Sequence, residues 1–566
     1  MQGVIFKIST IAIKRSIPCF LKYILPFFLI VIGGCKKENK ISHPDEFSLS
    51  YTVNSAYNGS SIYGSLNLKP LIQIKFTSSV NSSTLQNHIK IFDSGGSPIP
   101  VTITQLGDDK IFLVSPQNQL ESFSTYQLKV DNTLQSASGG KLINPVTITL
   151  KTGIDRTDKF PRIPDDELLT LVQKQTFKYF WDFAHPVSGL ARERNTSGEV
   201  VTTGGSGFGI MSIVTAIERG FITRAAGLQR MQTIVSFLKN KVDKFHGAFP
   251  HWLNGTTGAV VPFSAKDNGA DLVETSFLMQ GLITARQYFS NADAAESALS
   301  NDINELWYGV EWNWFRKNNE NVLYWHWSPN FTWEINLPIK GWNESLITYV
   351  LAAASPTHAI PKPVYDNGWA SNGGMKNGNT YYGIQLPLGP SNGGPLFFSH
   401  YSFLGINSNN LSDAYANYFT QNKNHALINY NYAVADPKKF GYSDSIWGLT
   451  ASDIPNGYTA SSPNNDVGVI APTAALSSFP YTPVESMKAL KFFYYKLGDK
   501  LWKEYGFVDA FSLHHAWFAN SFLAIDQGPI IIMIENYRTG LLWNLFMSAP
   551  EVKVGLIKLG FQSPHL

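Results

Sequence analysis

The chain has 566 residues, which is more than one ordinary domain requires. Its formal net charge is +3 and no basic tract or stripe stands out, which excludes a nucleic-acid partner recognised through charge. All 14 tryptophans lie at or after Trp181, so the part of the chain before Trp181 and the part after it are expected to have different functions.

Residues 1–35 are predicted to be a lipoprotein signal peptide. Four basic residues precede the apolar run 23–35, which ends in Gly33-Gly34-Cys35 and resembles a bacterial lipobox. We expect cleavage before Cys35 and lipidation of that cysteine, which would anchor the protein to the bacterial outer membrane, on its periplasmic or cell-surface side. The alternative is a plain signal peptide or a short transmembrane anchor, although the run is short for a span.

This processing would also decide the cysteine chemistry of the mature protein. Cys19 would be removed and Cys35 acylated, which leaves no disulfide, no CxxC metal site and no cysteine nucleophile. The four basic residues would be lost as well, so the mature chain is close to neutral and electrostatic steering of a charged partner is not expected.

A β-rich module is predicted after a polar tether at residues 36–46. Within 47–153, segments rich in Val, Ile, Thr and Phe alternate with turn residues, at 71–80, 88–94, 100–106, 110–116, 125–131 and 145–153. Short strands at this spacing predict a β-sandwich. The pattern resembles the bacterial Ig-like modules of surface lipoproteins, and such modules usually act as spacers.

Residues 165–566 are predicted to form a helical domain, joined to the module by a Pro- and charge-rich linker at 154–164. Helical periodicity marks 165–184, 207–220, 224–242, 270–289, 296–312, 343–355, 411–422, 424–433, 484–504 and 529–547. Several of these helices are apolar nearly all round, which indicates burial on more than one side. Helices separated by long loops indicate an all-α (α/α)6 toroid with its site at one end, an interpretation that rests partly on the family resemblance given below.

Three carboxylates mark the start of the predicted helix 270–289. Asp271 and Glu274 fit a capping box, with an acid at the N-cap and a glutamate three residues later. Asp267 lies before them, across Gly269. A cap needs one or two of these acids, and the surplus suggests an active site.

A second acidic position lies among tryptophans. Glu344 starts the predicted helix 343–355, where the helix dipole alone would favour an acid. Trp342 lies beside it, and the loop 324–338 adds further tryptophans and His326. Tryptophan in a loop rich in Gly, Pro and Asn is typical of a stacking platform for sugar faces, although buried tryptophans are more often core.

A third group surrounds the last long helix. Gly528-Pro529 is expected to start that helix, with Asp526 in the loop before it. Glu535 lies inside the helix, where an ion pair with Arg538 is the structural alternative. Glycoside hydrolysis needs two carboxyl groups around one bond, and three acidic groups at helix starts fit that chemistry.

The sequence contains no motif that would indicate another class of reaction. The sequence has no GxSxG elbow, no HExxH and no P-loop. His, Asp and Glu do not cluster at metal-ligand spacing, so no metal or cofactor is expected.

From about Leu168 to Met547 the chain resembles the glucoamylase-like family of Bacteroidetes lipoproteins, which includes β-1,2-glucan hydrolases (glycoside hydrolase family 144). The resemblance is carried by "DNGADLVETSFLMQGLI", "GWNESLITYVLAAASPTHAI", "PLFFSHYSFLGI", "WGLTASDIPNGY", "APTAALSSFPYTPVESM" and "AIDQGPIIIMIENYRTGLLW". It implies an (α/α)6 barrel that cleaves β-1,2-glucan with inversion, either internally or by releasing sophorose from an end.

The resemblance also implies site residues. The family's candidate catalytic acids correspond to Asp267, Asp271, Glu274 and Glu344, all present here. Glu344 is the expected general acid, and Asp271 or Glu274 would activate the water, directly or through a relay. Further substrate-binding or structural candidates are Trp342, Trp325, Trp327, His400, Tyr401, Trp447, Asp526 and Glu535.

Two alternatives to a β-1,2-glucan hydrolase stay open. The fold could serve a hydrolase of another glucan, or the chain could be a non-catalytic glycan-binding lipoprotein of an uptake system. The intact acids favour an enzyme. A monomer is expected, with a glucan or oligosaccharide as its substrate.

Overall fold

The structure is a computed structural model that describes residues 45–290 and 293–566. The predicted signal peptide, the lipidation of Cys35 and nearly all of the tether 36–46 lie outside the described residues. Among the described helices, none combines the length and the apolar character that crossing a bilayer requires.

The N-terminal domain consists of two sheets that share one core. One sheet has the order β1 (Leu49–Val53), β3 (Ile72–Phe76), β7 (Ile111–Pro116), β6 (Val101–Gln105). The other has the order β2 (Ile62–Leu66), β9 (Val146–Thr152), β8 (Thr125–Val130), β4 (Ile89–Phe92), β5 (Pro98–Ile99). Alternate residues of β7 and β8 point into the core, as the period of two predicts. Only β2 and β9 pair in parallel among these strands.

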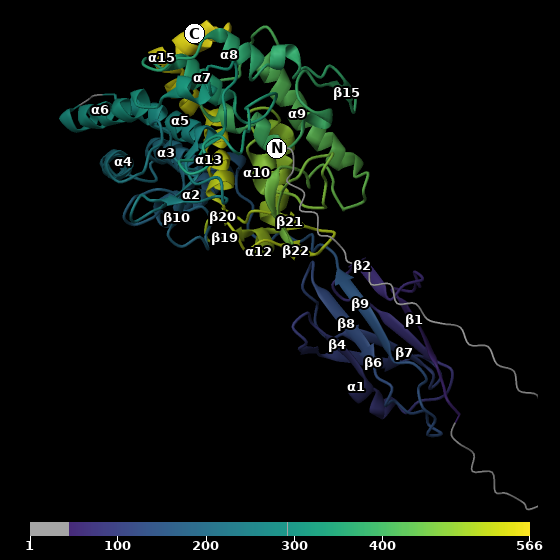
Figure 1. Ribbon diagram of the computed structural model, residues 1–566. Coiled ribbons are helices and arrows are strands. Elements are labelled where there is room, and N and C mark those ends of the chain that lie inside the picture. Colours follow the sequence, from purple (N-terminus) through teal and green to yellow (C-terminus); the bar gives the residue numbers. More distant parts are fainter. Residues whose placement is uncertain (1–44, 291–292) are drawn as a thin grey trace, which may run out of the picture.

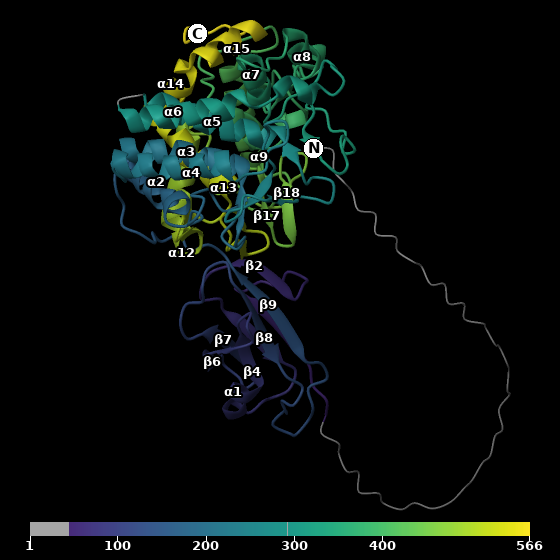
Figure 2. The same ribbon diagram turned by 60° about the vertical axis from the view of Figure 1, so that its left-hand side comes forward.

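The C-terminal domain is mainly helical. Its helices are α2 (Asp165–Trp181), α3 (Thr203–Glu218), α4 (Arg224–Asn240), α5 (Leu272–Tyr288), α6 (Ala294–Tyr308), α7 (Leu346–Ala354), α8 (Lys362–Asn367), α9 (Tyr418–Ala435), α10 (Pro472–Leu476), α11 (Pro483–Lys491), α12 (Gly498–Leu501), α13 (Ala524–Arg538), α14 (Leu541–Ser548) and α15 (Pro550–Leu559). Figure 1 and Figure 2 show these helices as one body above the smaller β-domain.

Short strands and tight helical turns occupy the long loops. The strands are β10 (Val200–Thr202), β11 (Trp252–Asn254), β12 (Val260–Val261), β13 (Ala270–Asp271), β14 (His326–Trp327), β15 (Thr380–Tyr381), β16 (Ile384–Gln385), β17 (Ala451–Ile454), β18 (Gly457–Ala460), β19 (Trp502–Lys503), β20 (Gly506–Phe507), β21 (Phe511–Ser512) and β22 (Trp517–Phe518). Two 3-10 turns, η5 (Leu396–Ser399) and η6 (Tyr401–Leu404), follow each other directly around His400.

Helices α3 and α5 cross with their backbones in close contact. A Cβ atom on Gly207 would lie 2.2 Å from the carbonyl oxygen of Phe277, and one on Gly281 would lie 2.3 Å from the carbonyl oxygen of Gly207. Glycine is therefore required at both positions. The crossing brings the first turn of α3 beside the first turn of α5, where the predicted acids lie.

Three helix predictions need correction. The segments 411–422 and 424–433 form one helix, α9, which starts only at Tyr418, where Asn417 caps it. The segment 484–504 is interrupted, because the chain winds more widely at 492–496 before α12. Helix α7 starts at Leu346, so Glu344 lies just before the helix and its side chain is free to serve a site.

Helix α13 starts earlier than Gly528-Pro529. It begins at Ala524, so Asp526 lies in its first turn and Pro529 lies inside the helix. Because Pro529 is close to the helix start, its missing N–H removes a single bond to the preceding turn. The prediction that Asp526 lies in a loop is wrong.

The two domains are joined by a packed contact. The ring of Phe123 in the β-domain packs edge-on against Phe518, with centroids 5.8 Å apart, and belongs to the core of the helical domain. The linker is packed as well, since Phe160 stacks on Tyr494 with centroids 4.6 Å apart. Lys500 and Glu121 add an ion pair of 3.2 Å.

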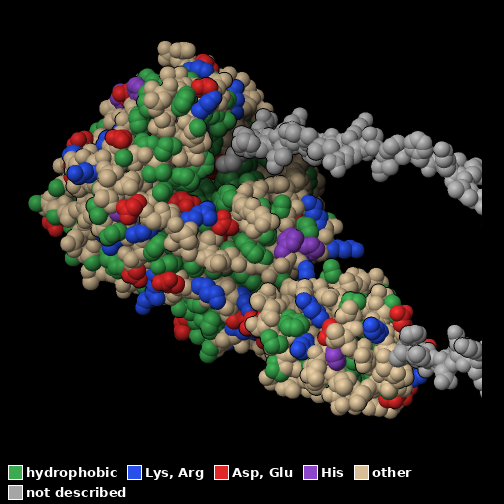
Figure 3. Space-filling model, turned by 60° about the horizontal axis from the view of Figure 1, so that its bottom comes forward, with side chains coloured by type: hydrophobic (Ala, Val, Ile, Leu, Met, Phe, Trp, Pro, Cys, Tyr) green, Lys and Arg blue, Asp and Glu red, His purple; other side chains and the backbone are tan. Residues whose placement is uncertain are grey.

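Charged side chains are mixed over the surface. On the face shown in Figure 3, acidic and basic groups alternate without a patch of one sign. This distribution fits the expectation that charge does not select the partner of this protein.

Candidate active site

Asp271 is both a helix cap and a member of a charged cluster. Its Oδ1 accepts hydrogen bonds from the backbone N–H groups of Val273 at 3.0 Å and Glu274 at 2.9 Å, which caps α5. Its Oδ2 lies 2.9 Å from Nδ1 of His251. The capping interpretation is therefore correct but incomplete, since one oxygen caps the helix and the other holds a histidine.

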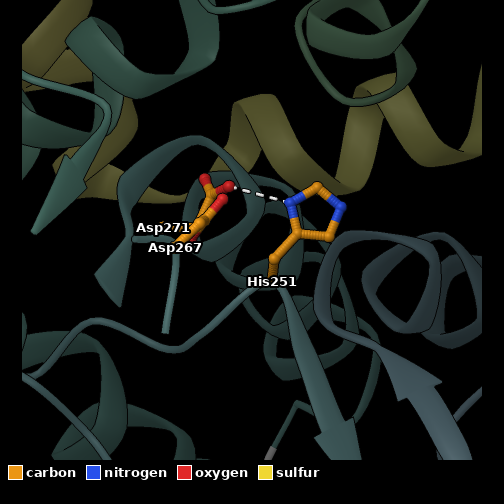
Figure 4. Close-up of side chains that lie close together, drawn as sticks. All are labelled: His251, Asp267 and Asp271. Atoms are coloured by element: carbon orange, nitrogen blue, oxygen red, sulfur yellow. Dashed lines mark hydrogen bonds and ion pairs between the residues drawn. The ribbon is translucent and has the colours of Figure 1, made fainter. Parts of the chain in front are cut away.

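Two histidines complete this cluster: His326, which the sequence placed in the tryptophan-rich loop without a role of its own, and His251, which was not predicted. Figure 4 shows the ring of His251 directed at the carboxylate of Asp271, with Asp267 beside it. His326 is placed by the pairing of β13 with β14, and its Nδ1 lies 3.4 Å from Asp267 and 3.7 Å from Asp271. A detectable signal was present, because each histidine directly precedes a tryptophan, Trp252 or Trp327, in a polar loop.

The carboxylates set the charge of His251. Burial of the imidazole lowers its pKa, but Glu274, Asp271 and Asp267 outweigh this effect and raise the pKa of His251 to about 9. For Asp271, burial raises the pKa and the two histidines overcome that rise, so the pKa of Asp271 is lowered. Asp271 is thus an anion and His251 is its cationic partner.

His251, Asp267 and Asp271 also have the spacing of a metal site. They each place a ligand atom within 4.8 Å of the others, so the expectation that His and Asp do not cluster at metal spacing is wrong for this group. A protonated imidazole has no free lone pair for a metal ion. The raised pKa of His251 therefore favours an ion pair in this position.

Glu274 reaches from α5 to the start of α3. Its Oε2 accepts a hydrogen bond of 2.7 Å from the backbone N–H of Gly204. A side chain at Gly204 would meet this carboxylate, because a Cβ there would lie 2.6 Å from Oε2. Burial and the neighbouring Asp271 raise the pKa of Glu274. Within residues 45–290 and 293–566, its second oxygen, Oε1, accepts no hydrogen bond.

Glu344 is a buried acid that keeps its proton near neutral pH. Burial, followed by the charges of Glu274 and Asp271, raises the pKa of Glu344 to about 7. The backbone carbonyl of Glu344 accepts a hydrogen bond from the Ser402 hydroxyl, which fixes the residue against η6. A carboxyl group with a pKa near the working pH has the property that a general acid needs.

A second group of carboxylates lies at the start of α13. Asp453 on β17 donates its backbone N–H to Oδ2 of Asp509 at 2.7 Å, and the neighbouring Asp509 adds to the burial that raises the pKa of Asp526. Asp526 was predicted, whereas Asp453 and Asp509 were not. Asp453 lies on β17 and Asp509 between β20 and β21, and only the fold brings the three together.

Tyr401 connects the two acidic groups. It is buried at the start of η6, and burial raises its pKa, with Asp526, Tyr458, Glu344 and Glu274 adding to the effect. The charges of both Glu344 and Asp526 thus reach the hydroxyl group of Tyr401. The predicted residues Glu344, Tyr401 and Asp526 therefore belong to one region.

The predicted tryptophans divide between the site and its support. Trp325 stacks beside His326, with ring centroids 6.0 Å apart. Trp327 packs edge-on against His246 and Trp314, each at 5.3 Å. Trp342 is buried against Trp369, Phe403 and Tyr418 and supports the segment that carries Glu344.

Three further predicted substrate-binding residues need correction. Trp447 has no exposed surface and donates its Nε1–H to the backbone of Glu485, so it is a core residue. His400 is buried, its Nε2 pairs with Ser478, and burial lowers its pKa to about 3, which keeps it neutral. Glu535 is at the opposite end of α13 from Asp526.

The partner of Glu535 also differs from the expected one. Its carboxylate is bound by the guanidinium of Arg219 at 2.7 and 2.9 Å, rather than by Arg538. Arg538 instead contacts Asp166 at 2.7 Å on α2. The i,i+3 spacing could not reveal this partner, because Arg219 comes from the C-cap of α3, far from Glu535 in the sequence.

An exposed aromatic ring lies beside the histidine cluster. Phe263 is 50% exposed, and its ring centroid is 4.3 Å from that of His251 and 4.8 Å from that of Trp252. Neither aromatic residue was predicted. An exposed ring next to buried acids is a surface on which the C–H face of a sugar can stack.

Two family models match the chain. Residues 336–550 match the family described as "Putative glucoamylase", and residues 58–152 match the bacterial Ig-like domain. The Ig-like module and the glucoamylase-like region that the sequence predicts are therefore confirmed.

A curated relative from Parabacteroides distasonis is named exo beta-1,2-glucooligosaccharide sophorohydrolase (non-reducing end). It is 50% identical to this chain over 419 residues. The match covers 70% of this chain and 58% of the relative, so the chain spans less than two thirds of that protein.

Solved structures resemble most of the chain. An endo-beta-1,2-glucanase from Chitinophaga pinensis, in complex with sophorotriose and glucose, is 54% identical, with a TM-score of 0.70 over 72% of this chain and 100% of that chain. A beta-1,2-glucanase from Parabacteroides distasonis is 42% identical, with a TM-score of 0.69 over 88% of this chain and 72% of that chain. With a relative of this identity matched along its whole length, the chain belongs to the glucoamylase-like family.

Proposed function

We propose that this protein is a glycoside hydrolase that cleaves β-1,2-glucan or β-1,2-glucooligosaccharides. The observation that carries the proposal is the pairing of a protonated Glu344 with the ionised cluster around Asp271 in one buried site. Such a pair of unequal carboxyl groups is what glycoside hydrolysis needs. The names of the relatives support the β-1,2 linkage, and both internal cleavage and sophorose release occur among them.

Glu344 is the proposed general acid. Its raised pKa keeps the proton available near neutral pH, and the proton passes to the glycosidic oxygen as the bond breaks. A water molecule then attacks the anomeric carbon from the opposite face, which inverts the configuration.

Glu274 is the proposed base for this water. Both oxygens of Asp271 already have partners, namely the α5 backbone and His251, whereas Oε1 of Glu274 has no hydrogen-bond donor in the part of the chain that the structure describes. Asp271 would then act by holding His251 and by keeping negative charge in the site. Asp267 would hold His326 in the same way.

The helical domain is proposed to be an (α/α)6 toroid. Six buried segments supply the site or its supports from their first residues, namely α3, α5, α7, η5 with η6, α10 and α13. The other helices would form the outer ring. This arrangement places the chemistry at one end, where substitutions in the loops change the site without changing the core.

The cellular setting is proposed from the sequence alone. The protein would act as a monomer, anchored to the outer membrane by a lipid on Cys35. Membrane fractionation of cells that produce the wild type or Cys35→Ser tests this point, and equal recovery of both forms in the soluble fraction would contradict it.

A product profile tests the activity. The soluble protein is incubated with β-1,2-glucan, β-1,3-glucan, β-1,4-glucan and starch, and the products are resolved by size over time. Products from β-1,2-glucan alone are expected, with sophorose from the first time point for exo action or a ladder for endo action. Glu344→Gln should abolish turnover while binding persists. Turnover of another glucan, or binding without turnover by the wild type, would favour the two alternatives.

A further inference from the structure

The carboxylates at the start of α13 lack the partners that buried acids need. Asp526 is 1% exposed, yet neither of its oxygens has a hydrogen-bond donor within the described residues. Oδ1 of the buried Asp509 also has none. An unpaired buried carboxylate is costly, so these three oxygens require an explanation.

The nearby cation does not form an ion pair with Asp509 or Asp526. Arg194 is the nearby cation, and its ion pairs are with Glu193 at 2.9 Å and Asp453 at 3.3 Å. Asp453 also accepts from the Ser521 hydroxyl at 2.5 Å. Within the described ranges no ion pair reaches Asp509 or Asp526.

A proton shared between Asp509 and Asp526 supplies one of the missing hydrogen bonds. Two buried carboxyl groups in contact cannot both ionise, so one proton between them is the stable state. Burial raises the pKa of Asp509 to about 7, and burial together with Asp509 and Asp453 raises that of Asp526 well above its usual range. One oxygen then carries the proton and a second accepts it, which leaves the third oxygen without a donor.

Sugar hydroxyl groups match this arrangement. A hydroxyl both donates and accepts, and a carboxyl pair with a single proton does the same. Tyr401 lies near Asp526 as well as near Glu344, so a ligand at the pair would lie next to the bond that Glu344 acts on. Tyr458 on β18 pairs with Asp453 on β17 and is 48% exposed, so a surface ring adjoins this acidic group.

We propose that Asp509 and Asp526 share one proton and form a hydroxyl-binding subsite for a glucose unit of the substrate, adjoining Tyr401. The proposal rests on the proposed function and specifies how that site selects its sugar. A site built to bind a hydroxyl rejects an analogue that lacks it, because the buried polar group is then left unpaired. The pair would therefore be a specificity determinant that is separate from the acid Glu344.

The experiment measures sophorose binding by calorimetry in Glu344→Gln protein. Asp526→Asn retains the shape of the side chain but removes the shared proton, and Asp526→Ala removes the carboxyl group. Both are expected to weaken sophorose binding by about 10- to 100-fold, the loss of a hydrogen bond to a charged group. Glu535→Gln, at the other end of the same helix, is the matched control and should bind as before. Thermal melting checks that each variant is folded.

Deoxy analogues separate a direct contact from a structural effect. Sophorose derivatives that each lack one hydroxyl are measured for binding to two proteins. One carries Glu344→Gln alone, and the other carries both Glu344→Gln and Asp526→Ala. Removal of one particular hydroxyl should weaken binding to the protein that retains Asp526. The same removal should not weaken binding further in the protein that carries Asp526→Ala. The proposed subsite would be wrong if, for every hydroxyl, the affinity loss from removing it simply adds to the loss caused by Asp526→Ala. It would also be wrong if both Asp526 variants bind sophorose unchanged.

Failure of the subsite is distinguishable from failure of the function. If the wild type hydrolyses β-1,2-glucan while the Asp526 variants bind sophorose normally, only the subsite is wrong. If folded Glu344→Gln protein binds no sophorose and the wild type cleaves no β-1,2-glucan, the proposed function fails and the subsite with it.

Discussion

Replacing Glu274 by glutamine should move the pH dependence of the reaction in a defined direction. A general acid works while protonated, so the rate is expected to fall as pH rises through the pKa of Glu344, which is about 7. Glu274→Gln removes a neighbouring negative charge that contributes to this pKa. The fall should therefore move to lower pH, although not to the usual value of a glutamate, because burial is the larger cause.

The size of the effect follows from the populations of the protonated form. At pH 6 a carboxyl group with a pKa of about 7 is roughly nine-tenths protonated, whereas one at its ordinary value near 4.3 is only roughly 2% protonated. Burial and the neighbouring charges thus raise the population of the working acid by about 50-fold at this pH. Glu274→Gln should lose part of that factor, in addition to the loss of rate caused by removing the base.

The assay is kcat/KM for a β-1,2-glucooligosaccharide from pH 4.5 to 9.5. Glu535→Gln is the control, because Glu535 lies at the far end of α13 and its carboxylate is held by Arg219. The basic limb should keep its midpoint in Glu535→Gln and shift in Glu274→Gln. A midpoint near 9 in the wild type would instead indicate titration of His251, and an unshifted limb in Glu274→Gln would refute the assignment to Glu344.

Three further predictions concern parts away from the acid. Arg219→Met should lower the free energy of unfolding by roughly 3 kcal/mol, because the buried carboxylate of Glu535 loses its cationic partner; urea denaturation measures this, and an unchanged midpoint would contradict it. Phe123→Ala should speed tryptic cleavage of the linker 154–164 while the hydrolysis rate stays unchanged; equal cleavage of both proteins would mean that this contact does not hold the domains together. EDTA should leave the rate unchanged, because His251 is protonated and paired; a loss that one divalent cation restores would show that the cluster holds a metal.

The sequence predicted the domains better than the helix boundaries. Alternation and turn residues were enough for the β-module, because the strand period depends only on local pattern. Helix starts were harder, as Pro529 shows. A proline favours the first turn of a helix, which placed the predicted start at Pro529. The helix α13 instead starts at Ala524, before the proline, and Ala524 and Asp526 are buried there.

The candidate site was predicted where its residues are close in sequence. Asp271 and Glu274 lie on one helix turn, so their grouping followed from spacing. His251, Asp453 and Asp509 come from separate loops, and no local pattern links them to the acids. Trp447 was assigned wrongly for a related reason, because sequence alone does not say whether a tryptophan faces a cavity or the core.

The packing of Phe123 has a practical consequence for shortening the chain. The boundary between the two domains in the sequence is not the boundary between their cores, since Phe123 contributes to the core of the helical domain. A helical domain cut at the linker would expose Phe518 and the apolar surface around it. Such an exposed surface promotes self-association and lowers the soluble yield. A shortened protein therefore needs a polar replacement at Phe518, or it should retain the Ig-like module.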